Sequence, residues 1–200
     1  MDTDKKTIDL PGGRSLTLHP PQVKRDLARL VGFFTGLPPE SRKYLRYDVT
    51  DLEACRRRLG ELDGKNHWRM MAELDGEIVG DATLDRKPEG WTRHVAELRG
   101  VIHPNASDLG IGPILFGELL EIASSSGIER LSCEVMEKDL EHIEMMKSLG
   151  FDQDGLLFKY ARDVSGNLQN LVIMTIDLEA AWAKLAEQLE ELEIRHARVG

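Results

Sequence analysis

The chain has 200 residues, enough for one sizeable domain, and its 41% hydrophobic and 30% charged residues are typical of a globular rather than a disordered protein. Its net charge of −9 argues against nucleic acid as a partner, because phosphate contacts need clustered Lys and Arg. No apolar run approaches the ~20 residues of a membrane helix, and the first residues lack the apolar core of a signal peptide. We therefore expect a cytoplasmic protein without a membrane partner.

The N-terminal third is predicted to contain one short strand and three helices. Residues 1–13 are expected to form a flexible leader, and residues 15–19 alternate apolar and polar side chains as a strand does. Apolar residues at helical spacing then predict a helix between Pro20 and Gly36. Two shorter helices are expected at 39–45 and at 52–62, the second capped by Thr50 or Asp51.

The rest of the chain predicts a mixed sheet. Residues 68–74 and 77–84 are strands joined by Asp75-Gly76, the strongest hairpin signal in the chain. Further strands are expected at 91–103, 131–135, 156–164 and 168–178, and further helices at 113–127, 139–149 and 179–198. This order predicts an α/β (α+β) fold with helices on both faces of the sheet. The strands 91–103 and 131–135 should be parallel neighbours, because a helix of suitable length joins them.

The segment 96–127 is the most informative stretch. It predicts a strand, a turn and a helix that opens with Gly110, Gly112 and Pro113. Backbone N–H groups at such a helix start favour a phosphate or pyrophosphate, although the glycines could also serve tight packing alone. Gly100 lies inside the strand, which often marks a bulge or a close backbone approach. If strand pairing breaks after Gly100, the backbone of Val101 and Ile102 can bind an extended ligand.

These motifs resemble the GNAT superfamily of acyl-CoA-dependent N-acyltransferases over residues 15–178. Ser107-Asp108-Leu109-Gly110-Ile111-Gly112, after a strand and Pro104, is similar to the family's Gln/Arg-x-x-Gly-x-Gly/Ala signature, and Leu149-Gly150-Phe151 is similar to the end of its second signature. The resemblance implies a mostly antiparallel GNAT-like sheet in a domain at 14–178, and the C-terminal helix predicted at 179–200 is extra to that fold. It also implies acetyl-CoA as acyl donor and no metal. In this family pattern, the backbone of Val101 and Ile102 holds the pantetheine arm, and amides of Leu109, Gly110, Ile111 and Gly112 hold the pyrophosphate.

The chain departs from the family pattern at several positions. Ser107 replaces the usual Gln or Arg, Asp108 a frequent Gly, and Leu109 a frequent basic residue. Asp139 stands where Asn is common, and Met146 stands where a Tyr often serves as general acid. An inward carboxylate at Asp108 would repel a pyrophosphate. Two functions therefore stay open: an N-acetyltransferase acting on a primary amine (protein lysine or a small amine) by direct attack, or an acyl-CoA-binding sensor that has lost catalysis.

Direct attack needs a base, because only the neutral amine is a nucleophile. Glu97 is the first candidate, since it shares a strand face with Arg99 and Val101 and lies ten residues before Ser107. That is where the protein-lysine branch of the family carries its glutamate. The alternatives are an exposed edge glutamate, an ion pair with Arg99, or Glu134 as the base.

The remaining candidates have weaker patterns. His103 and His142 are expected near the cleft as surface or supporting residues, and Cys133 as a core residue. Tyr44, Tyr47 and Trp68 could border an acceptor pocket, with core packing the safer expectation for Trp68. The final helix carries a heptad-like stripe that could contact a second subunit as a homodimer or cover its own sheet: Leu178, Trp182, Leu185, Leu189 and Leu192.

Overall fold

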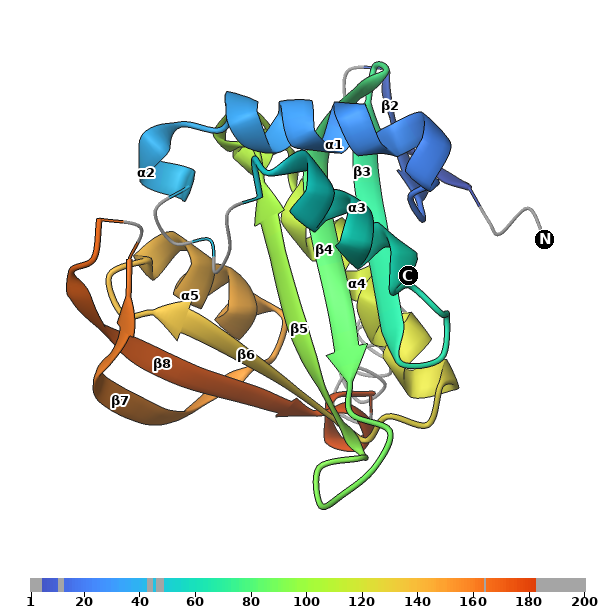
Figure 1. Ribbon diagram of the computed structural model, residues 1–200. Coiled ribbons are helices and arrows are strands. Elements are labelled where there is room, and N and C mark those ends of the chain that lie inside the picture. The colour runs from blue at the N-terminus through green and yellow to red at the C-terminus, as the bar shows by residue number, and fades with distance from the viewer. Residues whose placement is uncertain (1–4, 11–12, 43–44, 46–48, 164, 183–200) are drawn as a thin grey trace, which may run out of the picture.

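The computed structural model describes residues 5–10, 13–42, 45, 49–163 and 165–182. In these residues the chain forms one eight-stranded sheet with the order β1-β2-β3-β4-β5-β6-β8-β7 (Figure 1). All neighbours are antiparallel except β5 and β6, which are parallel as predicted. The strands are β1 (Lys6–Leu10), β2 (Arg14–His19), β3 (His67–Leu74), β4 (Glu77–Arg86), β5 (Val95–Ile102), β6 (Arg130–Met136), β7 (Asp152–Arg162) and β8 (Leu168–Asp177).

Helices cover both faces of the sheet, which confirms the predicted mixed fold (Figure 1). On one face lie α1 (Val23–Gly36) and α3 (Leu52–Gly60), which pack against each other, with the short α2 (Pro39–Arg42) after α1. On the other face lies α4 (Ile111–Ser125), which packs on β3, β4 and β5 and contacts α5 (Leu140–Ser148). A 3-10 helix, η1 (Pro104–Leu109), connects β5 to α4.

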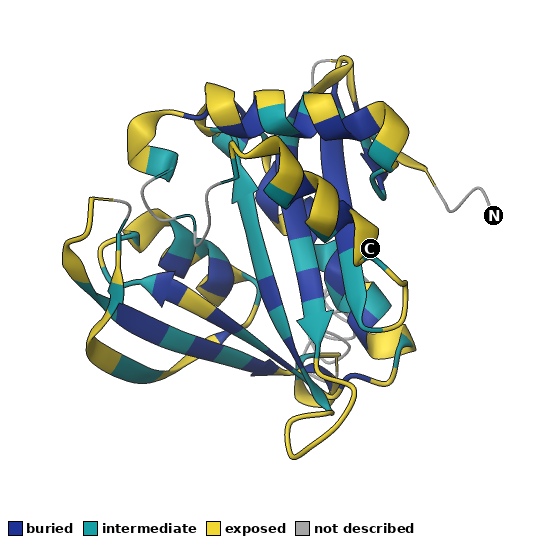
Figure 2. Ribbon diagram, viewed as in Figure 1, coloured by how far each residue is buried: buried dark blue, intermediate teal, exposed yellow. Residues whose placement is uncertain are grey.

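Two apolar cores follow from this layering. The larger core lies between the sheet and the α4–α5 layer and contains Leu98 and Phe116, while the smaller lies under α1 and α3 and contains Leu30 and Met71. Because both faces of β3 are covered, its residues from Met70 to Ala72 are all buried, on alternate sides (Figure 2). Packing on both faces therefore fixes the positions of the central strands and of the polar side chains that they carry.

The expectation of a flexible leader at residues 1–13 is wrong for its second half. Lys6–Leu10 forms β1, which pairs with β2 in antiparallel register from Lys6↔Leu18 to Leu10↔Arg14. Leu10 is buried and Ile8 packs against the larger core, so the segment alternates as an edge strand does. Gly13, with φ of 76°, stands at the turn of this hairpin rather than at the end of a leader.

Two predicted strand boundaries are also corrected. The strand predicted at 91–103 is β5, which begins at Val95 rather than at 91. The Val95 N–H donates to the Thr92 carbonyl in a turn, and Trp91 is 96% exposed. β7 begins at Asp152, four residues before the expected start, and ends at Arg162. Among the predicted caps of α3, Asp51 is confirmed, since its carboxylate accepts the N–H groups of Glu53 and Ala54.

Gly100 does not mark a bulge. The pairing of β4 with β5 runs without interruption from Gly80↔Ile102 through Ala82↔Gly100. A Cβ at Gly100 would lie 2.6 Å from Phe116 Cζ and 2.9 Å from the Asp81 carbonyl oxygen, so glycine is needed for the close approach of α4 to the sheet. Pairing does break, but on the other edge of β5 and after Glu97, three residues earlier than expected.

The C-terminal helix begins at Leu178, and its predicted continuation beyond Trp182 lies outside the described residues. The Trp182 indole N–H donates to Ser124 Oγ of α4 at 2.7 Å, so the start of this helix is attached to its own domain. None of the helices in the described part of the chain is both long and apolar enough to span a bilayer.

Candidate active site

The parallel strands β5 and β6 separate shortly after they begin to pair. Only Val95–Glu97 pairs with 130–132, after which β5 pairs with β4 alone and β6 with β8 alone (Figure 1). A cavity of about 740 Å³ opens along the gap, with Leu98 and Ile102 on one wall and Cys133 and Met136 on the other. The strand edges that face this gap can pair with an extended ligand in the manner of an added strand.

One end of this cavity is formed by the turn between η1 and α4. Gly110 ends η1 and precedes α4 in the left-handed conformation, with φ of 70°, which glycine adopts without strain. Gly112 follows in the first turn of α4, where a Cβ would come within 2.6 Å of Met145 Sδ. Both glycines line the cavity, and the first turn of α4 contains no acidic residue. The positive end of the helix dipole and the bare backbone suit a pyrophosphate group at this end.

The predicted cofactor-binding residues divide into two groups. Val101, Ile102, Gly110 and Gly112 line the cavity, whereas Leu109 and Ile111 do not line it and their side chains pack in the larger core. The two unusual residues of the loop, Ser107 and Asp108, are also on the cavity wall. Asp108 is exposed, so water screens its carboxylate at the mouth of the site.

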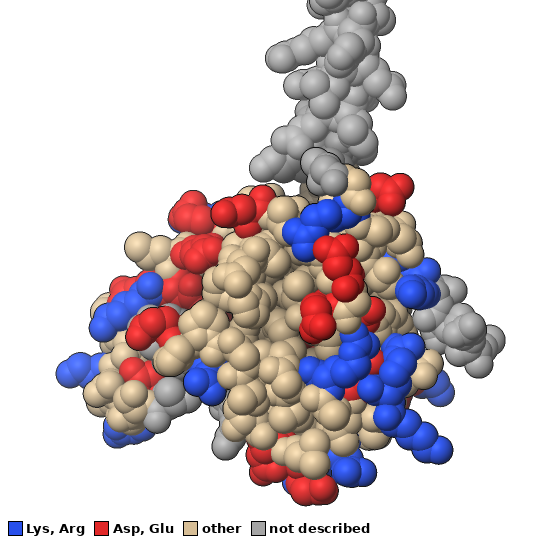
Figure 3. Space-filling model, turned by 90° about the horizontal axis from the view of Figure 1, so that it is seen from above, with Lys and Arg blue, Asp and Glu red and all other residues tan. Residues whose placement is uncertain are grey.

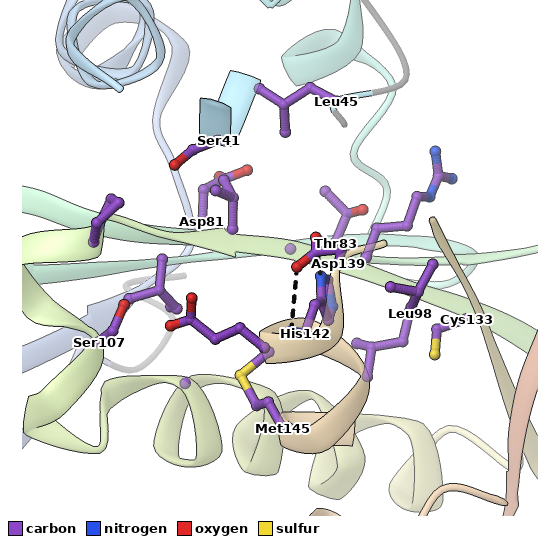
Figure 4. Close-up of a pocket in the computed structure, with 18 of the residues that line it drawn as sticks. Ser41, Leu45, Asp81, Thr83, Leu98, Ser107, Cys133, Asp139, His142 and Met145 are labelled. Carbon is purple, nitrogen blue, oxygen red and sulfur yellow. Dashed lines mark hydrogen bonds and ion pairs between the residues drawn. The ribbon is translucent and has the colours of Figure 1, made fainter. Parts of the chain in front are cut away.

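The opposite wall is supplied by the start of α5. Asp139 caps this helix by accepting the N–H of His142, and the imidazole of His142 lies in the cavity with Nδ1 3.8 Å from Asp139 Oδ2 (Figure 4). Burial lowers the pKa of His142, and the nearby Asp139 and Glu141 partly oppose this effect. Met146 is fully buried in the core, so the position at which the family often has Tyr presents no side chain to the cavity; the neighbouring Met145 lines it instead.

The cavity continues onto the α1–α3 face of the sheet, where Ser41, Leu45 and Thr83 lie (Figure 4). Here Arg69 Nε and Nη2 donate to the two carboxylate oxygens of Asp81 at 2.7 and 2.8 Å, and both side chains are less than 10% exposed. These residues were not predicted. The signal was present in β4, where Asp81, Thr83 and Asp85 put polar groups at every second position of a strand in a covered sheet.

Glu97 lies at the vertex of the gap, as the last residue of β5 that pairs with β6. Its side chain is 27% exposed, and its Oε2 lies 3.5 Å from Arg99 Nη2, so the ion pair considered as an alternative is present. The Arg99 guanidinium also donates to Asp85. Glu97 lines a second cavity, of about 630 Å³, rather than the first. The two cavities meet, because five residues line both of them: Arg58, Arg69, Thr83, Arg99 and Glu134.

The structure also places the other candidates. Cys133 is buried among core residues and borders the cavity, and Trp68 packs against the larger core beneath the Arg86 guanidinium. His103 caps η1 by accepting the Asn105 N–H and does not line the cavity. Tyr44 and Tyr47 lie outside the described residues. Within the described residues, no group of three or more His, Cys, Asp and Glu side chains is arranged to hold a metal ion.

Charged side chains of both signs surround this region. Figure 3 looks down on the upper face of the molecule as drawn in Figure 1, and there uncharged residues occupy the middle with acidic and basic residues interspersed around them. The cavity runs along apolar strand edges, with the glycine-containing start of α4 at one end and the polar pair Arg69–Asp81 at the other. This arrangement suits a long ligand that carries a phosphate group at one end and a reactive group at the other.

Comparison with known proteins agrees with this geometry. Residues 27–151 match the family model "Acetyltransferase (GNAT) family". The L-amino acid N-acetyltransferase AaaT of Escherichia coli is 26% identical over 94 residues, which cover 46% of this chain and 58% of that protein, so the chain matches little more than half of its length.

The fold matches many solved structures, of which two serve as examples. RimJ of Mycobacterium smegmatis, in complex with CoA-disulfide, has a TM-score of 0.74 at 18% identity and covers 92% of this chain and 94% of its own. The ribosomal-protein-alanine N-acetyltransferase of Brucella melitensis has a TM-score of 0.70 at 23% identity, covering 80% and 98%. The chain belongs to the acetyltransferase (GNAT) family of acyl-CoA-dependent N-acyltransferases.

Proposed function

We propose that this protein transfers the acetyl group of acetyl-CoA to a primary amine by direct attack, with Glu97 as the base. One observation carries the proposal: β5 and β6 part directly after Glu97, so the vertex of the gap, the donor cavity and this carboxylate meet at one place. The CoA-disulfide named with RimJ supports a CoA thioester as donor.

The residues of the first cavity would position the donor. The free edge of β5 at Val101 and Ile102 offers backbone groups to the pantetheine amides, and the α4 start at Gly110 and Gly112 offers N–H groups to the pyrophosphate. Acetyl-CoA supplies an activated acyl carbon as a thioester. Because its position would be held by backbone geometry, the unusual side chains of Ser107 and Asp108 are compatible with binding.

Glu97 would act on the acceptor. A primary amine is mostly protonated at neutral pH, and Glu97 accepts the proton so that the nitrogen lone pair can attack the carbonyl carbon. The C–N bond then forms and the C–S bond breaks, and the second proton that leaves the nitrogen is taken up by the CoA thiolate, directly or through water. Arg99, whose Nη2 lies 3.5 Å from Glu97 Oε2, would orient the carboxylate between turnovers.

A second candidate function is an acyl-CoA-binding module without catalysis. It is favoured by the burial of Met146, which leaves no acid at the position where the family often has Tyr, and by the carboxylate of Asp108 on the cavity wall. The two functions differ in turnover. Both predict that acetyl-CoA raises the melting temperature, but only the enzyme releases free CoA thiol in the presence of an amine.

The test combines thermal shift with thiol release over an amine panel at pH 6–9. We expect Glu97→Gln to keep the acetyl-CoA thermal shift and to lose at least 100-fold in kcat/KM, in keeping with the usual contribution of a general base. Glu77→Gln, an exposed glutamate at the start of β4, is the matched control and should be unchanged. Equal rates for Glu97→Gln and the native protein at every pH would exclude Glu97 as the base.

Two further predictions concern assembly and location. We propose that the stripe containing Leu178 and Trp182 continues into a homodimer contact, which light scattering of the native chain and of a chain ending at residue 178 would test. The cytoplasmic location is a prediction from the N-terminal sequence, and cell fractionation would test it by locating the protein in the cytoplasmic fraction.

A further inference from the structure

The imidazole of His142 extends from the start of α5 into the first cavity (Figure 4). Its Nδ1 lies 3.8 Å from Asp139 Oδ2, which is too long for a hydrogen bond, and among the described residues neither ring nitrogen has a hydrogen-bond partner. The side chain is 24% exposed, so the ring is open to the cavity. An apolar ring would serve packing equally well, whereas ring nitrogens without protein partners point to a ligand.

The His142 ring lies beside the part of the gap that the acyl end of the donor would occupy. Its centroid is 6.3 Å from that of Phe116, and Phe116 Cζ is 2.6 Å from the position of a Cβ on Gly100 of β5. Gly100 stands between Glu97, at the vertex, and residues 101–102, which would hold the pantetheine arm. The thioester joins the acetyl group to that arm, so its sulfur would lie along the stretch of β5 next to this ring.

His142 also stands one helical turn before the position at which the family often has Tyr. Residues four apart fall on the same side of a helix, but Met146 is fully buried whereas His142 lines the cavity. An imidazole accepts and donates a proton near neutral pH, which a thioether cannot do. The side chain on α5 that can handle a proton beside the sulfur is therefore His142.

The surroundings of the ring favour its neutral form at rest. Burial lowers the pKa of His142, and Asp139 and Glu141 on the same helix oppose this effect, so the ring is mostly neutral at pH 7. A neutral ring with its Nδ1–H towards the Asp139 carboxylate leaves Nε2 as a proton acceptor, and the same carboxylate stabilises the imidazolium once it forms. Other elements around the gap add these ionisable groups to the cavity wall: Arg99 from β5, Cys133 and Glu134 from β6, and Asp108 from η1.

From this arrangement we infer that His142 carries the second proton of the amine to the sulfur of the departing CoA. After Glu97 has taken the first proton and the nitrogen has attacked, the tetrahedral intermediate holds a cationic nitrogen and an oxyanion. His142 Nε2 accepts a proton from that nitrogen, the C=O bond re-forms, and the C–S bond breaks with its electron pair on sulfur. Nε2 then gives the proton to sulfur, which yields the amide, the CoA thiol and a neutral ring. The inference rests on the proposed function, since it needs acyl transfer by direct attack.

Nuclear magnetic resonance of the native protein tests the contact without turnover. The imidazole carbon–proton signals are followed on addition of CoA, and of a CoA analogue in which hydrogen replaces the thiol. We expect CoA to shift the His142 signal at least twice as far as the analogue does. His94 lines neither cavity, so its signal should respond to neither ligand. Equal shifts of the His142 signal with both ligands would show that the ring does not contact the sulfur.

Single-turnover acetyl transfer, with protein in excess over acetyl-CoA, measures the chemical step apart from product release. His142→Gln should keep the acetyl-CoA thermal shift and lose about 100-fold in this rate, and His94→Gln, the matched control, should lose nothing. In His142→Ala, added imidazole should restore the rate at least tenfold, because it can enter the vacated space and carry the proton. The same imidazole should not restore Glu97→Gln.

A change at Asp139 tests the proton on the ring through the pH profile. Asp139→Asn keeps an oxygen that can cap α5, but the carboxylate no longer raises the pKa of His142. The rate falls at low pH as His142 becomes protonated and can no longer accept a proton. This acid limb should therefore move to lower pH in Asp139→Asn, and an unchanged limb would contradict the relay.

The outcomes separate the inference from the proposed function. A native rate in His142→Gln would refute the relay and leave the acetyltransferase intact. A rate loss in His142→Ala that imidazole does not restore would also refute the relay, and would assign the ring to positioning the donor. A native protein that releases no thiol with any amine would refute the proposed function and the proton transfer together, whereas a sulfur-dependent signal would still place His142 at the thiol. If His142→Gln does not fold, His142→Asn takes its place.

Discussion

Replacing Gly100 by alanine tests how closely α4 packs on the sheet that forms the active-site gap. The new Cβ would lie 2.6 Å from Phe116 Cζ, 2.9 Å from Ala82 Cβ and 2.9 Å from the Asp81 carbonyl oxygen. Overpacking of this kind costs about 1–3 kcal/mol. Two of the three neighbours belong to the paired strand β4 and cannot rotate away, so the cost should lie near the upper end, at about 3 kcal/mol.

Alanine also lowers the entropy of the unfolded chain relative to glycine, which returns about 0.5 kcal/mol. The expected net loss is therefore about 2.5 kcal/mol, or roughly 5–10 °C in melting temperature for a chain of this size. Urea unfolding measures it as a lower midpoint at constant slope.

Gly117→Ala is the control, because Gly117 lies in α4 with no atom within 4 Å of the added Cβ. It should stabilise the protein by up to about 1 kcal/mol through helix propensity. The double variant Gly100→Ala with Phe116→Leu should lose less than the sum of its parts, since the smaller side chain removes the shortest contact. A Gly100→Ala midpoint equal to that of the native protein would refute the close approach of α4 to β5.

Three more predictions follow from the site. Because burial lowers the pKa of His142, the unfolded chain binds a proton at a higher pH than the folded chain does. The free energy of unfolding should therefore fall as the pH drops below about 6.5, by at most about 1.4 kcal/mol per pH unit. Unfolding curves at pH 7, 6 and 5 should show a smaller loss of stability for His142→Gln than for the native protein. Asp81→Ala leaves the Arg69 guanidinium buried and unpaired, which should cost about 3–5 kcal/mol in urea unfolding, and replacing both residues by apolar ones should cost less than this single change. Gly112→Ala brings a Cβ within 2.6 Å of Met145 Sδ, near the end of a flexible side chain, so it should cost only about 1 kcal/mol in stability but reduce the acetyl-CoA thermal shift.

Local signals were enough to predict most of the fold. The Asp75-Gly76 hairpin, the Asp51 cap and the parallel placement of β5 and β6 depend on neighbouring residues or on one connecting helix, and the structure has all three. β1 was missed because the turn at Gly13 looks the same in sequence whether it ends a leader or closes a hairpin.

Features that depend on contacts between residues far apart in the chain could not be predicted from the sequence. The role of Gly100 depends on Phe116, sixteen positions later and on another element, so packing and a bulge could not be told apart. The second cavity collects residues from α3 and four strands, and only the register of those strands reveals that Arg99 stands between two cavities. The side chains that line the second cavity were therefore predicted least well.

The short junction between β5 and β6 also divides the sheet mechanically. Three residue pairs connect a five-stranded part to a three-stranded part, and beyond them the parts are joined by packing in the larger core, by the contact of α4 with α5 and by the Trp182–Ser124 hydrogen bond. We expect backbone amides of β6, β7 and β8 to exchange hydrogen as one cooperative unit, at a lower free energy than those of β3 and β4. The protein then has a built-in place for partial opening, and a ligand bound across the gap would suppress that opening and slow exchange on both sides at once.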